Sequence, residues 1–174
     1  MLLSSDERWR SCLDLLGPRL LLYARQWVAE PADAEDVVQS AFIRFWKKHP
    51  AATESEWPLL YASVRCAALD MLRRENRRAR RDDSFAADAS PAAANLFAST
   101  LEQREEADLM SARLNDLPAE QREAIVLRIW GDLTFQQIAT IAGVSINTVA
   151  ARYRYGLAAM RRSLHPSDYD RIRT

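Results

Sequence analysis

The sequence predicts an all-α protein of two small helical domains joined by a flexible linker. Apolar residues recur at helical spacing in several segments, each bounded by capping residues, proline or glycine. No segment alternates apolar and polar residues as a half-buried β-strand would. Residues 82–99 are rich in alanine, aspartate and serine and poor in large apolar residues, which is typical of a linker.

Three helices are predicted before the linker. The first begins near the N-terminus, and we expect Gly17-Pro18 to bend or break it before helix resumes over residues 22–28. Asp33 is the expected N-cap of the second helix, which stops at His49-Pro50. Ser55 can cap the third, whose far end is an arginine run.

The segment after the linker begins with two predicted helices. The first covers about residues 100–114 and has a strongly acidic face. The second runs from Pro118 to Trp130. We expect Gly131 to end it in the left-handed conformation.

Residues 134–155, TFQQIATIAGVSINTVAARYRY, have the spacing of a helix-turn-helix motif. Thr134 and Gln137 form a capping box for the first helix, Gly143 supplies the turn, and Ser145 caps a last helix that ends near Leu164. An ordinary αα-corner is the alternative, but such a corner seldom combines two caps, a glycine turn and a cationic end. The positions that the motif requires to be small or apolar are Ile138, Ala139, Ile146 and Val149. The polar residues of the second helix that can face a DNA major groove are Ser145, Asn147, Thr148, Arg152 and Arg154.

The charges are unevenly placed although the net charge is zero, with 24 basic and 24 acidic residues. Residues 65–81 hold seven basic and two acidic side chains, residues 82–123 hold three and ten, and residues 124–174 hold seven and three. Two basic blocks therefore flank an acidic one. This pattern indicates separate contact surfaces for a polyanion such as nucleic acid.

Several classes of function are excluded or disfavoured by composition. The four glycines are too widely spaced for a phosphate-binding or dinucleotide-binding loop. His49, His165, Cys12 and Cys66 are too far apart for a zinc motif, so we expect no metal and no cofactor. The carboxylates lie in caps and on the linker, which argues against an enzyme. We find no signal peptide and no apolar run long enough for a membrane, and we expect a cytoplasmic protein.

Three segments occur in an order and spacing that strongly resemble the extracytoplasmic-function (ECF) RNA polymerase sigma factors. These are DAEDVVQSAFIRFWKK (33–48), WPLLYASVRCAALDMLRRENRR (57–78) and LNDLPAEQREAIVLRIWGDLTFQQIATIAGVSINTVAARYRYGLAAMRRSL (114–164). The resemblance implies sigma region 2 over residues 1–81, an acidic linker over 82–104, sigma region 4 over 105–165 and a tail over 166–174. It implies as partners the RNA polymerase core, through the β′ clamp helices and the β flap, and promoter DNA. It also admits an anti-sigma protein as a partner.

The resemblance also assigns residues to roles. Asp36 and Gln39 match the segment that docks on the clamp helices, although Asp36 is also placed as a capping carboxylate. Segment 57–78 resembles the regions that open and read the −10 promoter element, where stacking surfaces and backbone charge hold melted DNA. Cys66 stands where many members have asparagine, so no −10 sequence preference is carried over. The residues assigned to −10 binding are Trp57, Tyr61, Arg65, Arg73, Arg74, Arg77 and Arg78.

Alternatives remain for the roles of single residues and for the function of the chain. Trp57 and Tyr61 serve equally well as core residues, and Asp70 can pair with Arg73 or Arg74 at helical spacing. The rival function is a helix-turn-helix regulator that binds operators as a dimer, with residues 1–81 as a sensor or dimerisation domain. A sigma factor would form a complex with core polymerase, whereas the rival would bind palindromic DNA alone.

Overall fold

The computed structural model describes residues 5–81, 110 and 112–164. The chain divides between Pro91 and Ala92 into two compact units. All regular structure in the described ranges is helical, which confirms the predicted all-α class. The predicted linker and C-terminal tail lie outside these ranges. No helix in the described part of the chain is long and apolar enough to cross a bilayer.

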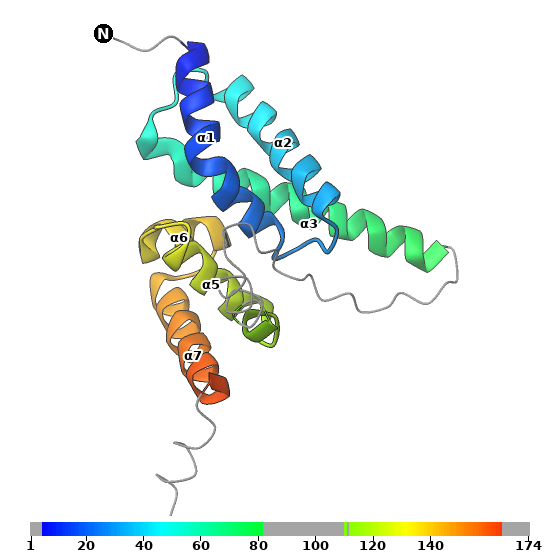
Figure 1. The fold of residues 1–174 in the computed structure, drawn as a ribbon, viewed down its shortest axis with the longest axis vertical. Helices are drawn as coiled ribbons and strands as arrows, with labels where there is room; N and C mark the ends of the chain where they lie inside the picture. Colours follow the sequence, from blue (N-terminus) through cyan, green and yellow to red (C-terminus); the bar gives the residue numbers. More distant parts are fainter. Residues whose placement is uncertain (1–4, 82–109, 111, 165–174) are drawn as a thin grey trace, which may run out of the picture. The chain divides into compact units, whose positions relative to one another are not determined.

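Within the described residues, the first unit contains three helices and one 3₁₀ turn (Figure 1). Helices α1 (Ser5–Ala24) and α2 (Pro31–Lys48) lie side by side, and the longer α3 (Trp57–Arg81) crosses both. The core forms where the three helices meet. Its fully buried side chains include Leu20, Tyr23, Leu60, Tyr61 and Val64.

Helix α1 runs without a break through Gly17-Pro18, so the predicted interruption is wrong. A proline inside a helix removes one backbone hydrogen bond and strains the preceding turn. Leu16 and Leu20 flank this site and are buried in the core. Burial of this apolar face outweighs the local cost. The helix then ends at Ala24, earlier than the predicted 28.

The starts of α2 and α3 also differ from the predicted caps. Glu30, not Asp33, is the N-cap residue of α2, because Pro31 supplies a φ suited to the first helical position. Thr53 replaces Ser55 as the cap before α3. Its side chain forms a capping box with Glu56 over the 3₁₀ turn η1 (Glu54–Glu56), and α3 follows directly. The predicted end of α2 before Pro50 is confirmed.

The second unit contains α5 (Ala119–Ile129), α6 (Phe135–Ala142) and α7 (Ile146–Leu164). Helix α7 packs on both others, and its Gly156 lies against α5, where an added Cβ would come 2.7 Å from Ile125 Cδ1. Only the end of the helix predicted over 100–114 is described, and residues 112–115 are helical there.

The turn after α5 differs from the sequence prediction in one residue. Asp132, with φ 53°, takes the left-handed conformation expected of Gly131. A Cβ at Gly131 would lie 2.5 Å from the carbonyl oxygen of Leu127, so the glycine is needed there for space. Aspartate is among the few residues that adopt the left-handed conformation readily.

Candidate nucleic-acid and polymerase interfaces

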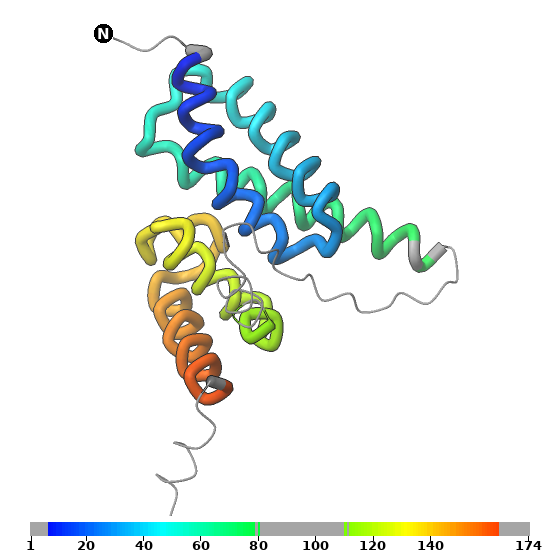
Figure 2. The backbone as a smooth tube through the Cα atoms, viewed as in Figure 1, coloured from blue at the N-terminus to red at the C-terminus, as the bar shows by residue number. Residues whose placement is uncertain are grey.

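The helix-turn-helix of α6 and α7 is built as the sequence predicts. The Thr134 hydroxyl accepts a hydrogen bond from the Gln137 amide at 3.2 Å, and the Gln137 side chain accepts one from the Thr134 amide at 2.8 Å. Gly143 ends α6 with φ 69°, and the backbone turns tightly into α7 (Figure 2). The Ser145 hydroxyl then accepts from the Thr148 amide at 3.1 Å. Both helices therefore begin at fixed residues, and their crossing is well defined.

Three of the four positions expected to hold this crossing together are buried. Ile138 and Val149 are each 1% exposed and Ala139 is 4% exposed, so these expectations are confirmed. Ile146 is the exception, because 43% of its surface is exposed. It occupies the first turn of α7 on a side that the other helices leave exposed, and its expected burial is wrong.

The predicted base-reading residues of α7 fall into two groups. Ser145 and Thr148 share a hydrogen bond of 2.8 Å between their hydroxyls and both serve the cap. Asn147 and Arg154 are exposed, and Arg152 is half-buried. The Arg154 guanidinium lies over the ring of the exposed Tyr155, 5.1 Å from its centroid. Asn147 and Arg154 are therefore the predicted base-reading residues of α7 that are both exposed and not used by the cap.

An unpredicted set of contacts holds the start of α6 against α7. Arg128 donates a hydrogen bond to the Leu133 carbonyl at 2.8 Å, and its guanidinium lies 5.5 Å from the Phe135 ring centroid. Phe135 meets Tyr153 of α7 edge to face at 5.4 Å. This chain of contacts joins α5, α6 and α7. The sequence shows its residue types but not their proximity, because they are distributed over three helices.

The arginines of α3 form the basic surface of the first unit. The C-terminal turns of α3 extend past α1 and α2, so residues 73–78 are all exposed (Figure 1). Arg73 forms an exposed ion pair with Asp70 at 3.0 Å, one of the two pairings expected. Arg74, Arg77 and Arg78 add three cations on the same exposed segment. Such a row can neutralise several backbone phosphates.

The other predicted −10 residues lie nearer the core. Tyr61 is 1% exposed, and its ring packs 5.7 Å from that of Tyr23. Its assignment as a stacking surface is therefore corrected: in this structure it is a core residue, because α3 turns that face onto α1. Trp57 is half-buried. Arg65 is also half-buried and lies over the Trp27 ring at 5.5 Å.

Helix α2 presents an exposed ridge that contains both predicted polymerase contacts. Asp36, Gln39, Ile43 and Lys47 follow one another along the helix and are all exposed. The opposite face, with Val37, Phe42 and others, is buried. Trp46, on the same helix, is half-buried. A groove runs along each side of the ridge.

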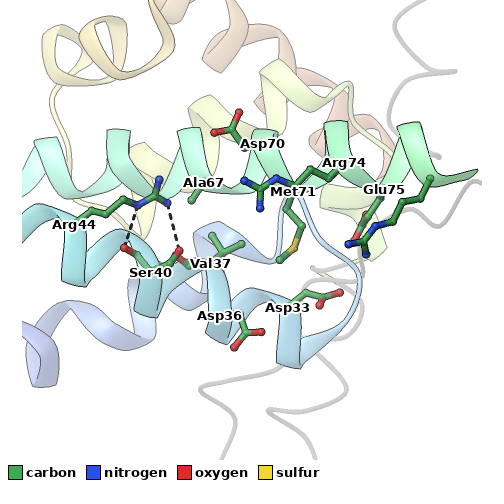
Figure 3. Close-up of a pocket in the computed structure, with 11 residues that line it drawn as sticks. Asp33, Asp36, Val37, Ser40, Arg44, Ala67, Asp70, Met71, Arg74 and Glu75 are labelled. Atoms are coloured by element: carbon green, nitrogen blue, oxygen red, sulfur yellow. Dashed lines mark hydrogen bonds between the residues drawn. The ribbon is translucent and has the colours of Figure 1, made fainter.

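The groove between α2 and α3 is polar and has a volume of about 360 Å³ (Figure 3). Carboxylates and arginines from both helices line it, and Asp36 lies at its edge with its carboxylate turned away from the α3 arginines (Figure 3). Arg44, which was not among the predicted site residues, lies on α2 and donates a hydrogen bond to the Ser40 carbonyl at 3.2 Å. The charged lining residues are Asp33, Asp36, Arg44, Asp70, Arg74, Glu75 and Arg78.

The groove between α1 and α2 is apolar and has a volume of about 300 Å³. Trp9 and Phe42 meet edge to face in its wall, with ring centroids 5.7 Å apart. Gln39 and Ile43 form its edge on α2. Two grooves beside an exposed ridge form a surface on which the side chains of a partner helix can interlock.

The described residues contain no group of three or more side chains suited to bind a metal ion. Cys12 is buried, and burial raises the pKa of its thiol to about 11. Cys66 is exposed on α3, and both cysteines are free.

Both units match known families. Residues 13–78 match Sigma-70 region 2, and residues 107–160 match Sigma-70, region 4. The chain belongs to the ECF sigma factors of the sigma-70 family. A sigma factor binds core RNA polymerase and directs promoter recognition and transcription initiation. The rival, an autonomous operator-binding regulator, is not favoured by this membership.

Relatives support the assignment along most of the chain. The RNA polymerase sigma-E factor of Streptomyces avermitilis is 29% identical over 151 residues, which cover 87% of this sigma factor and 82% of the relative. The ECF RNA polymerase sigma factor SigL of Mycobacterium tuberculosis is 29% identical over 156 residues, covering 89% and 88%.

Two solved structures share the fold. One is the sigma factor RpoE of Bartonella quintana in complex with the anti-sigma factor NepR, with a TM-score of 0.69 and 23% identity. The match covers 92% of this sigma factor and 98% of the RpoE chain. The other is CnrH in complex with the cytosolic domain of CnrY, with a TM-score of 0.62, 20% identity, and coverage of 93% and 90%.

Proposed function

We propose that the two units of this sigma factor divide promoter recognition between them. The exposed arginines of α3 hold the −10 region as it melts, and α7 reads the −35 element in the major groove. The observation that supports this most is the capped α7 with Asn147 and Arg154 exposed on its outer face. Asparagine suits adenine and arginine suits guanine or phosphate. The protein has no catalytic centre of its own under this proposal, since it acts through the polymerase.

The ridge of α2 is our proposed polymerase contact. Asp36 and Gln39 lie on it between two grooves, and their side chains are exposed while the helix is anchored by its other face. Paired clamp helices of the β′ subunit can place side chains into both grooves. Because the ridge carries little of the fold, changes on it affect binding rather than stability.

A titration against core polymerase tests this contact. We expect Gln39→Ala and Asp36→Arg to weaken binding of the full chain to core enzyme without changing its thermal unfolding. Asp14→Arg is the matched control, since it reverses the same charge at an exposed position of α1. Wild-type affinity in both ridge variants would contradict the proposal.

We further propose that the protein acts in the cytoplasm, where polymerase and promoter DNA are found, and that an anti-sigma protein sequesters it. Two sigma factors of similar fold are held by NepR and by the cytosolic domain of CnrY in their complexes. The ridge and the apolar groove beside it offer a surface for such a protein. An anti-sigma protein bound there would compete with core polymerase in the same titration.

A further inference from the structure

The first residue of α7 is an exposed isoleucine. Ile146 is 43% exposed, whereas Val149, one turn further, is 1% exposed. Leaving a large apolar side chain in water forgoes much of the stabilisation that burial gives. Single exposed apolar residues are common on proteins, so position must decide whether this one has a role. Its position is the N-terminal turn of a recognition helix, where helix-turn-helix proteins contact base edges.

The residues on either side of Ile146 in the cap are less available for base contact than Ile146 itself. Ser145 and Thr148 bond to each other and to the helix cap, so their hydroxyls have partners within the protein. In the first turn, Ile146 and Asn147 are the side chains that remain exposed. A polar side chain, Asn147, and an apolar one, Ile146, are therefore exposed next to each other in the N-terminal turn of α7.

The next residue along the same side of α7 is small. Ala150 follows Ile146 at one helical turn, and Arg154 follows one turn later. An alanine here lets the helix approach the floor of the major groove. The exposed Arg154 guanidinium can contact the DNA groove at the far end of the row formed by Ile146, Ala150 and Arg154.

We propose that Ile146 recognises thymine by packing on its C5-methyl group in the −35 element. Thymine is the DNA base that displays a methyl group in the major groove, and apolar side chains read it by contact. The inference rests on the proposed reading of the −35 element by α7 and adds a specific base to it. Ile146 and Asn147 together would read a step that contains thymine and adenine.

Deoxyuridine substitution tests the contact directly. Holoenzyme assembled from the full chain and core polymerase first selects promoters from duplexes randomised in the −35 element. Each enriched thymine is then replaced by deoxyuridine, which pairs identically but lacks the methyl group. At one position we expect wild-type holoenzyme to bind the deoxyuridine duplex about fourfold more weakly, the factor for one methylene-sized contact. The Ile146→Ala holoenzyme should bind both duplexes equally.

Two controls make the result decisive. Ile129→Ala makes the same change at an isoleucine that is 50% exposed at the end of α5, and it should keep the wild-type preference for thymine. Asn147→Ala tests the reading by α7 itself, because it should alter the selected sequence whatever Ile146 does. An unaltered selection in Asn147→Ala would refute the reading by α7.

Three results would overturn the thymine contact while the reading by α7 stands. They are a selection that enriches no thymine, a wild type that never distinguishes thymine from deoxyuridine, and an Ile146→Ala variant that distinguishes them as strongly as wild type. Because Ile146 is exposed, its substitution should not unfold the chain.

Discussion

At the scale of single residues, exposure separates side chains that build the fold from those that can meet a partner. Tyr61 and Arg65 carry residue types suited to DNA, but α3 turns them toward Tyr23 and Trp27. Arg154 has the opposite placement. It is exposed on α7 and lies over the Tyr155 ring, which limits the freedom its guanidinium loses on binding.

Arg154→Ala should therefore weaken promoter binding by the holoenzyme. The expected cost is about 1–3 kcal/mol if the guanidinium reads a base, or a salt slope lower by about one if it holds a phosphate. Arg152→Ala should cost less, because Arg152 is half-buried. Binding is measured by titration with promoter duplex over a range of salt concentrations.

The control for these variants is Arg10→Ala, which removes an exposed arginine from α1. It should leave both the affinity and the salt slope unchanged. Core-polymerase binding should persist in all three proteins. Unchanged promoter affinity in both α7 variants would show that this helix does not contact DNA.

At the scale of secondary-structure elements, caps and turns determine where each helix points. The turn at Gly143 fixes the direction of α7, and its φ of 69° strains any residue with a side chain. Gly17, by contrast, lies inside α1. An added Cβ there would meet Leu13 Cδ1 at 3.7 Å, an ordinary van der Waals distance. The two glycines thus serve different needs.

Replacement of each glycine by alanine should change stability in opposite directions. Gly143→Ala should lower the free energy of unfolding by about 1–2 kcal/mol, because alanine must adopt a left-handed conformation. Gly17→Ala should raise it by about 0.5–1 kcal/mol, because glycine is poorly suited to a helix interior. Urea unfolding followed by circular dichroism measures both. Destabilisation by Gly17→Ala would mean that α1 needs the glycine at its proline site.

Local signals in the sequence predicted most elements, but not those decided by distant packing. The capping box at Thr134, the turn at Gly143 and the cap at Ser145 depend on neighbours within three residues, and all three are confirmed. The continuity of α1 through Pro18 depends on burial against other helices. The exposure of Ile146 depends on how α7 packs on α5 and α6.

The same division applies to the candidate site. The arginine run predicted an exposed cationic surface because six arginines within residues 73–81 cannot all be buried. The groove lined by Asp36, Arg74 and Arg78 was not predicted, since it arises from the crossing of α2 and α3. Residues that act together across helices are seen only once the helices are packed.

In the molecule as a whole, we expect two weak DNA contacts to become one specific contact on the polymerase. Residues 65–81 and 124–174 carry basic surpluses, while residues 82–123 hold ten acidic and three basic residues. In the free protein this acidic segment opposes binding of a polyanion. Core polymerase would hold both DNA-binding units at promoter spacing, which raises their effective concentration for each other's sites.

The most direct measurement is a pair of titrations on one promoter fragment, with free protein and with holoenzyme at the same ionic strength. A scrambled fragment of the same length gives the non-specific affinity in each case. We expect the free protein to bind both fragments weakly and almost equally, and the holoenzyme to prefer the promoter strongly. Equal preference for the promoter by free protein and holoenzyme would rule out this bivalent mechanism and indicate a regulator that recognises DNA alone.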